Sequence, residues 1–278
     1  MATCYRHPAR ETGVSCSNCG RPICPDCMTT SPVGMRCPDC ARQTTKVRTI
    51  RQTTARRGYE ATLALIAINA IVFLTEGSTA FTLTGDVNFN TSSVAFHGLL
   101  YGPFIEFNHQ YYRLLTSGFI HLDFLHIGLN MYVLYWVGRL LEPAIGRVRF
   151  VTIYFTGLLA GSLGVLILSP TNPTAGASGA IFGLMGAAFM EAHRRGAEQV
   201  RNQLVMLIVV NLALTVGIAG VSVGAHIGGL IGGGLAALAF QQGERARRAV
   251  LGYAACLALA AICVAASIIV ANNISPPV

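Results

Sequence analysis

A serine and a histidine interrupt two otherwise apolar stretches of this 278-residue chain. Ser178 lies where one long hydrophobic run begins, and His226 lies at the start of another. Polar side chains are costly in lipid and usually mark a functional site there. A histidine can take the proton of a serine that attacks a carbonyl carbon, and can then return it to the leaving amine. The pair predicts nucleophilic catalysis, provided that the two stretches bring these side chains together.

Two further polar residues fit the same chemistry. His126 and Asn130 are four positions apart, so they share one face of a helix. Donors held in a dry site stabilise the oxyanion that forms when a carbonyl is attacked. We expect His126, Asn130 and the backbone N–H of Ser178 to be such donors. No acidic residue nearby is an obvious third member, so the residues favour a Ser178–His226 dyad without a catalytic metal.

Each of these residues also has a structural interpretation when it is taken alone. A serine in a membrane helix commonly bonds its own backbone. An intramembrane histidine can relay protons or simply form a packing bond. It is the combination of the four residues that favours catalysis.

Composition indicates that membrane helices must position these residues. The chain is 53% hydrophobic and 12% charged, whereas soluble domains contain about 25% charged residues. Most of its apolar runs are near the length of about 20 residues that crosses a bilayer as a helix. They lie at roughly 60–75, 114–138, 150–168, 178–192, 203–219, 224–241 and 249–271. The sequence therefore predicts an all-α polytopic membrane protein with seven spans.

Basic residues between the runs predict the orientation. They are abundant before the first span and follow the second, fourth and sixth spans, whereas the alternate segments hold only Arg113. The positive-inside rule then puts the N-terminus in the cytoplasm and the C-terminus outside the cell membrane. The net charge of +8 is scattered over short segments, so nucleic acid is not an expected partner. This orientation places five polar residues in the outer half of the membrane: His121, His126, Asn130, Ser178 and His226.

Glycines at helical spacing predict close contact between the spans that carry Ser178 and His226. Stripes of small residues let helix backbones approach one another. Two stripes lie in span six and one in span four: Gly224/Gly228/Gly232, Gly229/Gly233 and Gly179/Gly183/Gly186. If these faces meet, Ser178 and His226 come within hydrogen-bond reach.

Charged residues near the inner end of span two are expected to be structural. Glu142 and Arg139 are three positions apart on that span. Residues at this spacing are neighbours on a helix, which favours a surface or inter-helix ion pair. They lie on the opposite side of the membrane from Ser178, so a catalytic role is not expected.

The first 40 residues hold seven of the nine cysteines, in pairs separated by two residues, together with one histidine. The pairs are Cys4/His7, Cys16/Cys19, Cys24/Cys27 and Cys37/Cys40. These eight ligands suit two tetrahedral structural zinc ions, with no position free for water. Short spacers favour an interleaved arrangement, with the first and third pairs on one ion and the second and fourth on the other, and sequential pairing is the alternative.

A disulfide knot is a different interpretation of this cysteine-rich head. It would leave one cysteine unpaired, give His7 no role and require an oxidising compartment. The head has few apolar residues, so metal binding should supply most of its folding free energy. It resembles a B-box-type zinc finger. The sequence leaves the role of the head open. It could dock a cytosolic protein partner or substrate tail, assist assembly, or regulate the membrane part.

The motifs of the membrane part together resemble those of the rhomboid intramembrane serine proteases. Four pieces match: His121-x-x-x-x-His126-x-x-x-Asn130, Gly176-x-Ser178-Gly179, Ala225-His226-x-x-Gly229-x-x-x-Gly233, and Tyr112-Arg113 where the family has Trp-Arg. The resemblance covers about residues 58–242. It implies a Ser178–His226 dyad, with His126 and Asn130 assisting the oxyanion and a structural role for His121.

The same resemblance implies an architecture and an activity. The expected domains are a cytosolic zinc-binding domain at 1–42, a basic linker at 43–58, a six-helix core at 59–242, and a seventh helix with a short external tail at 243–278. The expected activity is that of an intramembrane serine endopeptidase in the lipid bilayer. Its substrates would be single-span membrane proteins, cut near the outer face.

Two other functions fit parts of the sequence. A protease-like binding protein would handle membrane clients without cutting them, but such relatives lack the serine or the histidine, and both are present here. A transporter with a zinc-binding cytosolic regulator would predict inverted repeats and helices broken near the midplane. No clear repeat is found, and the polar residues gather at one side.

Overall fold

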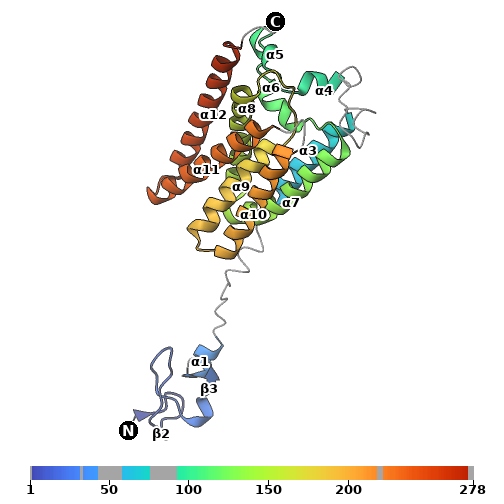
Figure 1. The fold of residues 1–278 in the computed structure, drawn as a ribbon. Coiled ribbons are helices and arrows are strands. Elements are labelled where there is room, and N and C mark those ends of the chain that lie inside the picture. The colour runs from blue at the N-terminus through green and yellow to red at the C-terminus, as the bar shows by residue number, and fades with distance from the viewer. Residues whose placement is uncertain (1, 32–33, 43–57, 76–92, 218–221, 275–278) are drawn as a thin grey trace. The chain divides into compact units, whose positions relative to one another are not determined.

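The computed structural model describes residues 2–31, 34–42, 58–75, 93–217 and 222–274. The chain divides into two compact units, Met1–Thr53 and Thr54–Val278 (Figure 1). All but one residue of the basic linker expected at 43–58 lies outside the described residues.

The N-terminal unit consists of short elements around a cluster of cysteines. Strands β1 (Ala2–Thr3) and β2 (Glu11–Thr12) pair antiparallel, as do β3 (Thr29–Ser31) and β4 (Gly34–Arg36). Two single-turn helices follow cysteines, η1 (Pro25–Cys27) and α1 (Pro38–Ala41). The buried apolar cluster contains six cysteines and only one other residue, Ile23. Such a small core cannot supply much hydrophobic free energy.

The second unit contains one long helix for each of the seven expected spans (Figure 1). They are α3 (Glu60–Thr75), α7 (Phe124–Ile145), α8 (Arg147–Leu168), α9 (Ser178–Arg194), α10 (Glu198–Gly217), α11 (Val223–Arg245) and α12 (Ala249–Ala271). Among the described helices, α8, α11 and α12 are long and apolar enough to cross a membrane, and α3 is a shorter apolar helix. The all-α polytopic fold predicted from the sequence is confirmed.

The start expected for span two is wrong. Residues 113–119 form two short helices, α6 (Arg113–Thr116) and η3 (Ser117–Phe119), and α7 begins only at Phe124. The carboxylate of Asp123 accepts the N–H of His126 at 2.7 Å and so caps the new helix. His121 consequently lies in the turn before α7 and not within a membrane helix. Hydropathy alone did not reveal this boundary, because the residues on both sides of it are apolar.

Arg113 organises the segment that precedes these helices. Its side chain is 1% exposed, and Nη1 donates to the carbonyl oxygens of Phe96 and Leu99, both at 2.7 Å. These carbonyls lie at and just beyond α4 (Ser93–Gly98). The guanidinium also lies over the ring of Phe104 in α5 (Gly102–Glu106), 4.4 Å from its centroid. Arg113 therefore ties α4 and α5 to α6.

One stripe of glycines on α11 packs against α8. A Cβ at Gly224 would lie 2.2 Å from the carbonyl oxygen of Gly164, and one at Gly228 would lie 2.4 Å from that of Ala160. Neither position can hold a side chain without moving a backbone. The longer stripe of span six therefore meets α8, and not the helix that carries Ser178.

The second stripe on α11 packs against α9. A Cβ at Gly229 would lie 2.0 Å from the carbonyl oxygen of Gly179, and one at Gly233 would lie 2.0 Å from that of Gly183. Helices approach this closely only where small residues face each other. A Cβ at Gly186 on α9 would likewise lie 2.5 Å from the carbonyl oxygen of Leu230. The helices of Ser178 and His226 are thus in backbone contact along the face that carries the shorter stripe.

Glu142 does not form the ion pair expected with Arg139. Its carboxylate is 1% exposed and accepts the N–H groups of Ala61 at 3.0 Å and Thr62 at 2.8 Å, together with the Thr62 hydroxyl at 2.7 Å. The first N–H groups of a helix have no partner in that helix, and a negative charge there is favourable. Arg139 instead donates to the hydroxyl of Tyr135 at 3.1 Å. Glu142 therefore caps α3 from a neighbouring helix.

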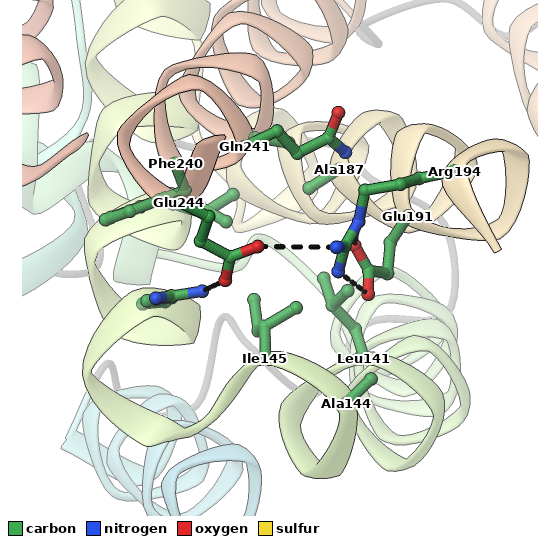
Figure 2. A pocket seen from close by; sticks show the side chains of 12 residues that line it. Leu141, Ala144, Ile145, Ala187, Glu191, Arg194, Phe240, Gln241 and Glu244 are labelled. Carbon is green, nitrogen blue, oxygen red and sulfur yellow. Dashed lines mark hydrogen bonds and ion pairs between the residues drawn. The ribbon is translucent and has the colours of Figure 1, made fainter. Parts of the chain in front are cut away.

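The ends of α8, α9 and α11 that lie remote from Ser178 are joined by charges (Figure 2). Glu244 contacts both Arg149 and Arg194, the latter at 3.3 Å, and Arg194 contacts Glu191 at 2.7 Å. These four side chains line a small cavity of about 40 Å³. Figure 2 labels Glu191, Arg194 and Glu244 among its lining residues. The network fixes the three helix ends relative to one another.

Candidate active site

Ser178 is the first residue of α9 and follows a sharp turn. Gly176 has a φ of 125°, which a residue with a side chain rarely adopts, and its N–H donates to the carbonyl oxygen of Ser117 at 2.9 Å. The turn directs the chain into the helix at Ala177. Because Ser178 is in the first turn, its backbone N–H has no partner within the helix.

His226 lies in the first turn of α11 and is 5% exposed. Its imidazole stacks on the ring of Phe182, with centroids 4.1 Å apart and planes inclined by 14°. Phe182 follows Ser178 by four positions, so both share one face of α9. The imidazole therefore lies against the helical face that begins with Ser178.

The two imidazole nitrogens of His226 have different surroundings. Nδ1 lies 2.7 Å from the hydroxyl oxygen of Thr215 in α10. Nε2 is buried and has no hydrogen-bond partner among the described residues. Catalytic hydrogen bonds are often unformed before substrate binds. Sequence reasoning missed Thr215, because a hydroxyl late in an apolar run gives no signal of the helix it will face.

His126 and Asn130 flank the turn that precedes Ser178. A Cβ at Gly176 would lie 2.7 Å from Nε2 of His126 and 3.9 Å from Nδ2 of Asn130. Asn130 also donates to the carbonyl oxygen of His126 at 3.0 Å, which leaves its second amide hydrogen for another acceptor. Both donors therefore face the backbone that leads into α9.

His121 supports that same turn. It is fully buried, and its Nε2 accepts the N–H of Ala177 at 3.5 Å, while Nδ1 lies 3.3 Å from the carbonyl oxygen of Phe119. A neutral imidazole with its hydrogen on Nδ1 satisfies both contacts. His121 thus joins the loop before α7 to the start of α9.

The structure brings the cysteines and His7 of the head into two groups. Cys4, His7, Cys24 and Cys27 form one, and Cys16, Cys19, Cys37 and Cys40 form the other, with all ligand atoms of a group within 4.8 Å of one another. This is the interleaved arrangement. All nine cysteines lie among the described residues and are free, so none is in a disulfide.

The separations within each group suit a tetrahedral ion. Nδ1 of His7 lies 3.4 Å from the sulfur of Cys24 and 3.5 Å from that of Cys27. In the other group, the sulfurs of Cys19 and Cys37 are 3.8 Å apart. Ligands bound to one zinc ion at about 2.0–2.3 Å lie roughly 3.5–3.8 Å from one another.

Backbone donors around the second group favour thiolates. The N–H of Cys37 donates to the sulfur of Cys16 at 3.2 Å, and the N–H of Cys40 donates to the sulfur of Cys37 at 3.3 Å. The backbone N–H groups of Cys37, Cys19 and Asn18, of which that of Cys37 contributes most, lower the pKa of the Cys16 thiol to about 6. Thiolates are the form of cysteine that binds metals. These donors would also hold the sulfurs in place around an ion.

Comparison with known proteins identifies the second unit. A sequence model of the Rhomboid domain matches residues 108–243. The YdcA protein of Bacillus subtilis (strain 168), whose name assigns it to the rhomboids, is 32% identical over 145 residues, which cover 50% of this chain and 72% of YdcA. The chain belongs to the rhomboid family. The rhomboid match contains the whole of the candidate active site, whereas the cysteine-rich head and α12 lie outside it.

Other relatives of this rhomboid protein differ in what their names state. The rhomboid protease GluP of B. subtilis (strain 168) is 35% identical over 133 residues, which cover 47% of this chain and 26% of GluP. Inactive RHOMBOID-like protein 8 of Arabidopsis thaliana is 35% identical over 80 residues, which cover 29% of this chain and 23% of that protein. The chain thus spans about a quarter of the length of these two relatives. Since one is named a protease and the other inactive, activity has to be argued from the site.

Proposed function

We propose that this rhomboid protein is an intramembrane serine endopeptidase that uses a Ser178–His226 dyad. The observation that carries the proposal is the buried Nε2 of His226. This nitrogen has no hydrogen-bond partner within the part of the chain that the structure describes, and its ring is stacked on the Ser178 face of α9. A buried nitrogen without a hydrogen-bond partner lowers the stability of the fold, so its presence favours a role in catalysis. As a general base, Nε2 would accept the hydroxyl proton of Ser178 while the oxygen attacks the substrate carbonyl.

Donors near Ser178 support the second half of this mechanism. Attack on the carbonyl produces an oxyanion, which needs hydrogen-bond donors in a site shielded from water. Nε2 of His126, Nδ2 of Asn130 and the N–H of Ser178 would supply them. The imidazolium of His226 would then protonate the leaving amine, and water would release the acyl group from Ser178 by the same steps. None of these steps uses a metal ion.

The substrates that we propose are single-span membrane proteins that approach from the bilayer. An apolar groove of about 440 Å³ lies between α7 and α10, lined in part by Tyr132, Trp136 and Met206. Tyr132 and Met206 are 69% and 70% exposed, so the groove offers lipid-compatible contacts. A transmembrane helix hides its carbonyls in its own hydrogen bonds, so a cleavable segment must unwind first.

The test of the proposed activity uses the full chain in detergent with a labelled single-span substrate. Wild type should cleave it, and Ser178→Ala and His226→Ala should reduce cleavage at least about 1,000-fold, as expected for the loss of a nucleophile or its base. Ser267→Ala is the matched control, because this hydroxyl is also buried in a membrane helix but lies in α12. Equal cleavage by wild type and both site variants would refute the proposal.

Covalent labelling gives an independent measurement. A fluorophosphonate should modify wild type at Ser178 and leave Ser178→Ala unlabelled. Labelling of His226→Ala should be slow, since the imidazole activates the hydroxyl. Equal labelling of the wild type and Ser178→Ala would show that another residue reacts.

We further propose that the head binds two zinc ions in structural sites, through the two groups of cysteines and His7 described above. Each group offers four protein ligands, so no position is open for catalysis. Metal analysis of the purified full chain should find about two zinc ions per molecule. A preparation that is fully folded but contains no zinc would contradict this.

The orientation that we propose has the N-terminus and the head in the cytoplasm and the short tail outside. Its support is the alternation of basic segments along the sequence, which also places Ser178 and His226 toward the outer face. A protease added to intact cells should remove a tag at the C-terminus and spare a tag at the N-terminus. The opposite pattern would invert the topology.

A further inference from the structure

Thr215 is a buried hydroxyl that contacts the proposed general base from a third helix. It lies in α10 and is 4% exposed. Its Oγ1 is 2.7 Å from Nδ1 of His226 and 2.7 Å from the carbonyl oxygen of Asn211, one turn earlier on the same helix. The reaction proposed above gives Thr215 no part.

The two contacts of the Thr215 hydroxyl determine the direction of its hydrogen bond with His226. A hydroxyl has one hydrogen and can accept through its lone pairs, whereas a carbonyl oxygen can only accept. The hydrogen of Thr215 therefore goes to the carbonyl of Asn211. The contact with His226 must then run the other way, with Nδ1–H donating to Oγ1. A neutral imidazole with its hydrogen on Nδ1 leaves Nε2 with a free lone pair.

We propose that Thr215 is a positioning residue, which holds His226 in the tautomer whose Nε2 can accept the proton of Ser178. The catalytic consequence of this role rests on the proposed function. In a Ser-His-Asp triad a carboxylate selects the tautomer in the same way. A neutral hydroxyl does so here without a buried negative charge, which would be costly within a membrane.

Phe182 and Thr215 restrict different motions of the imidazole. Stacking on Phe182 fixes the plane of the ring but permits a half-turn about the Cβ–Cγ bond, which keeps that plane and exchanges Nδ1 with Cδ2. The bond from Nδ1 to Thr215 removes this remaining freedom and directs Nε2 away from α10. Three helices thus define the base: α11 carries it, α9 supports its face, and α10 orients it.

The tautomer can be measured without any assay of cleavage. The full chain is labelled with ¹⁵N-histidine in detergent, at a pH at which the imidazole of His226 is neutral, and its signals are assigned by their loss in His226→Gln. Wild type should show a protonated Nδ1 and an unprotonated Nε2. Thr215→Val keeps the shape but removes the acceptor, and should produce a mixture of tautomers, whereas Thr215→Ser should restore the wild-type spectrum.

A second threonine provides the control. Thr156 is 3% exposed in α8 and bonds the carbonyl oxygen of Thr152 at 2.8 Å, one turn earlier, just as Thr215 bonds that of Asn211. Thr156→Val therefore removes the same kind of hydroxyl from the same kind of helix and should leave the His226 signals unchanged. A wild-type spectrum with the hydrogen on Nε2, or one that Thr215→Val does not alter, would overturn the proposal.

Kinetics then separate this inference from the proposed function. Thr215→Val should lower kcat about tenfold with KM within about twofold, while Thr215→Ser and Thr156→Val should stay within about threefold of wild type. If wild type does not cleave at all, the proposed function fails and the ¹⁵N spectra still decide the tautomer. If wild type cleaves and Thr215→Val cleaves equally well, the positioning role is wrong and the dyad stands.

Discussion

The imidazole of His226 lies flat on the ring of Phe182, with the two centroids 4.1 Å apart. Phe182 belongs to the same helix as Ser178 and follows it by one turn. One helix therefore supplies both the proposed nucleophile and the surface on which the proposed base rests. Any change that separates α9 from α11 will separate the proposed nucleophile from the proposed base as well.

Replacement of Phe182 by leucine should impair catalysis more than folding. The leucine fills part of the space but offers no flat face, so the imidazole gains freedom and kcat should fall about tenfold or more. Phe182→Tyr keeps the ring and should stay within about threefold of wild type. Phe189→Leu, on the same helix beside His193, is the matched control for loss of an aromatic ring. An unchanged kcat in Phe182→Leu would show that stacking does not position the base.

Adjacent glycines on α11 should respond in opposite ways to alanine. At Gly233 a Cβ would lie 2.0 Å from the carbonyl oxygen of Gly183, whereas at Gly234 nothing lies within 4 Å. Gly233→Ala must push α9 away and should destabilise the protein by about 1–3 kcal/mol or prevent folding. Gly234→Ala should be neutral or stabilising by up to about 1 kcal/mol, because alanine favours the helix. Unfolding in a denaturing detergent measures the stability of each variant. Equal changes in stability for Gly233→Ala and Gly234→Ala would contradict the packing of α11 against α9.

Loss of Glu142 should destabilise the contact between α3 and α7. Glu142→Ala leaves three donors at the start of α3 without their acceptor, two of them buried, at a cost of about 1–3 kcal/mol. Glu142→Gln keeps one acceptor oxygen and should fall between alanine and wild type. Glu198→Gln is the control, since Glu198 is 78% exposed in its pair with Arg201. A melting temperature that is the same for Glu142→Ala and wild type would refute the capping role.

Replacement of a single cysteine in the head should remove one zinc ion and not both. Cys24→Ser alters only the group that contains His7, so the zinc content should fall from about two to about one per chain. The affected head should become sensitive to proteolysis, since we expect metal binding to supply most of its folding free energy. Cys263→Ser, in α12, should keep both ions. Loss of both ions in Cys24→Ser would show that the two sites fold as one.

Local patterns in the sequence were enough to predict the helices, the cysteine pairs and the candidate dyad of this protein. Seven apolar runs predicted seven long helices, because a bilayer requires helices of a defined length. The gaps of two residues between cysteines predicted metal ligands, because both side chains of such a pair can reach one ion. The sequence also proposed Ser178 and His226 as a dyad, since polar residues within apolar helices usually mark a functional site, and this proposal awaits the experiments above. Each of these features depends only on neighbouring residues.

Contacts between distant residues were decided only by the tertiary structure. Glu142 and Arg139 were expected to form a surface or inter-helix ion pair, but Glu142 instead accepts from Thr62, 80 positions away. The glycine stripes of α11 were visible in the sequence, yet only the structure assigns one to α8 and the other to α9. Thr215 gave no signal at all until α10 was placed beside His226. Periodicity defines which face of a helix is apolar or small, but the partner of that face depends on how all the helices pack together.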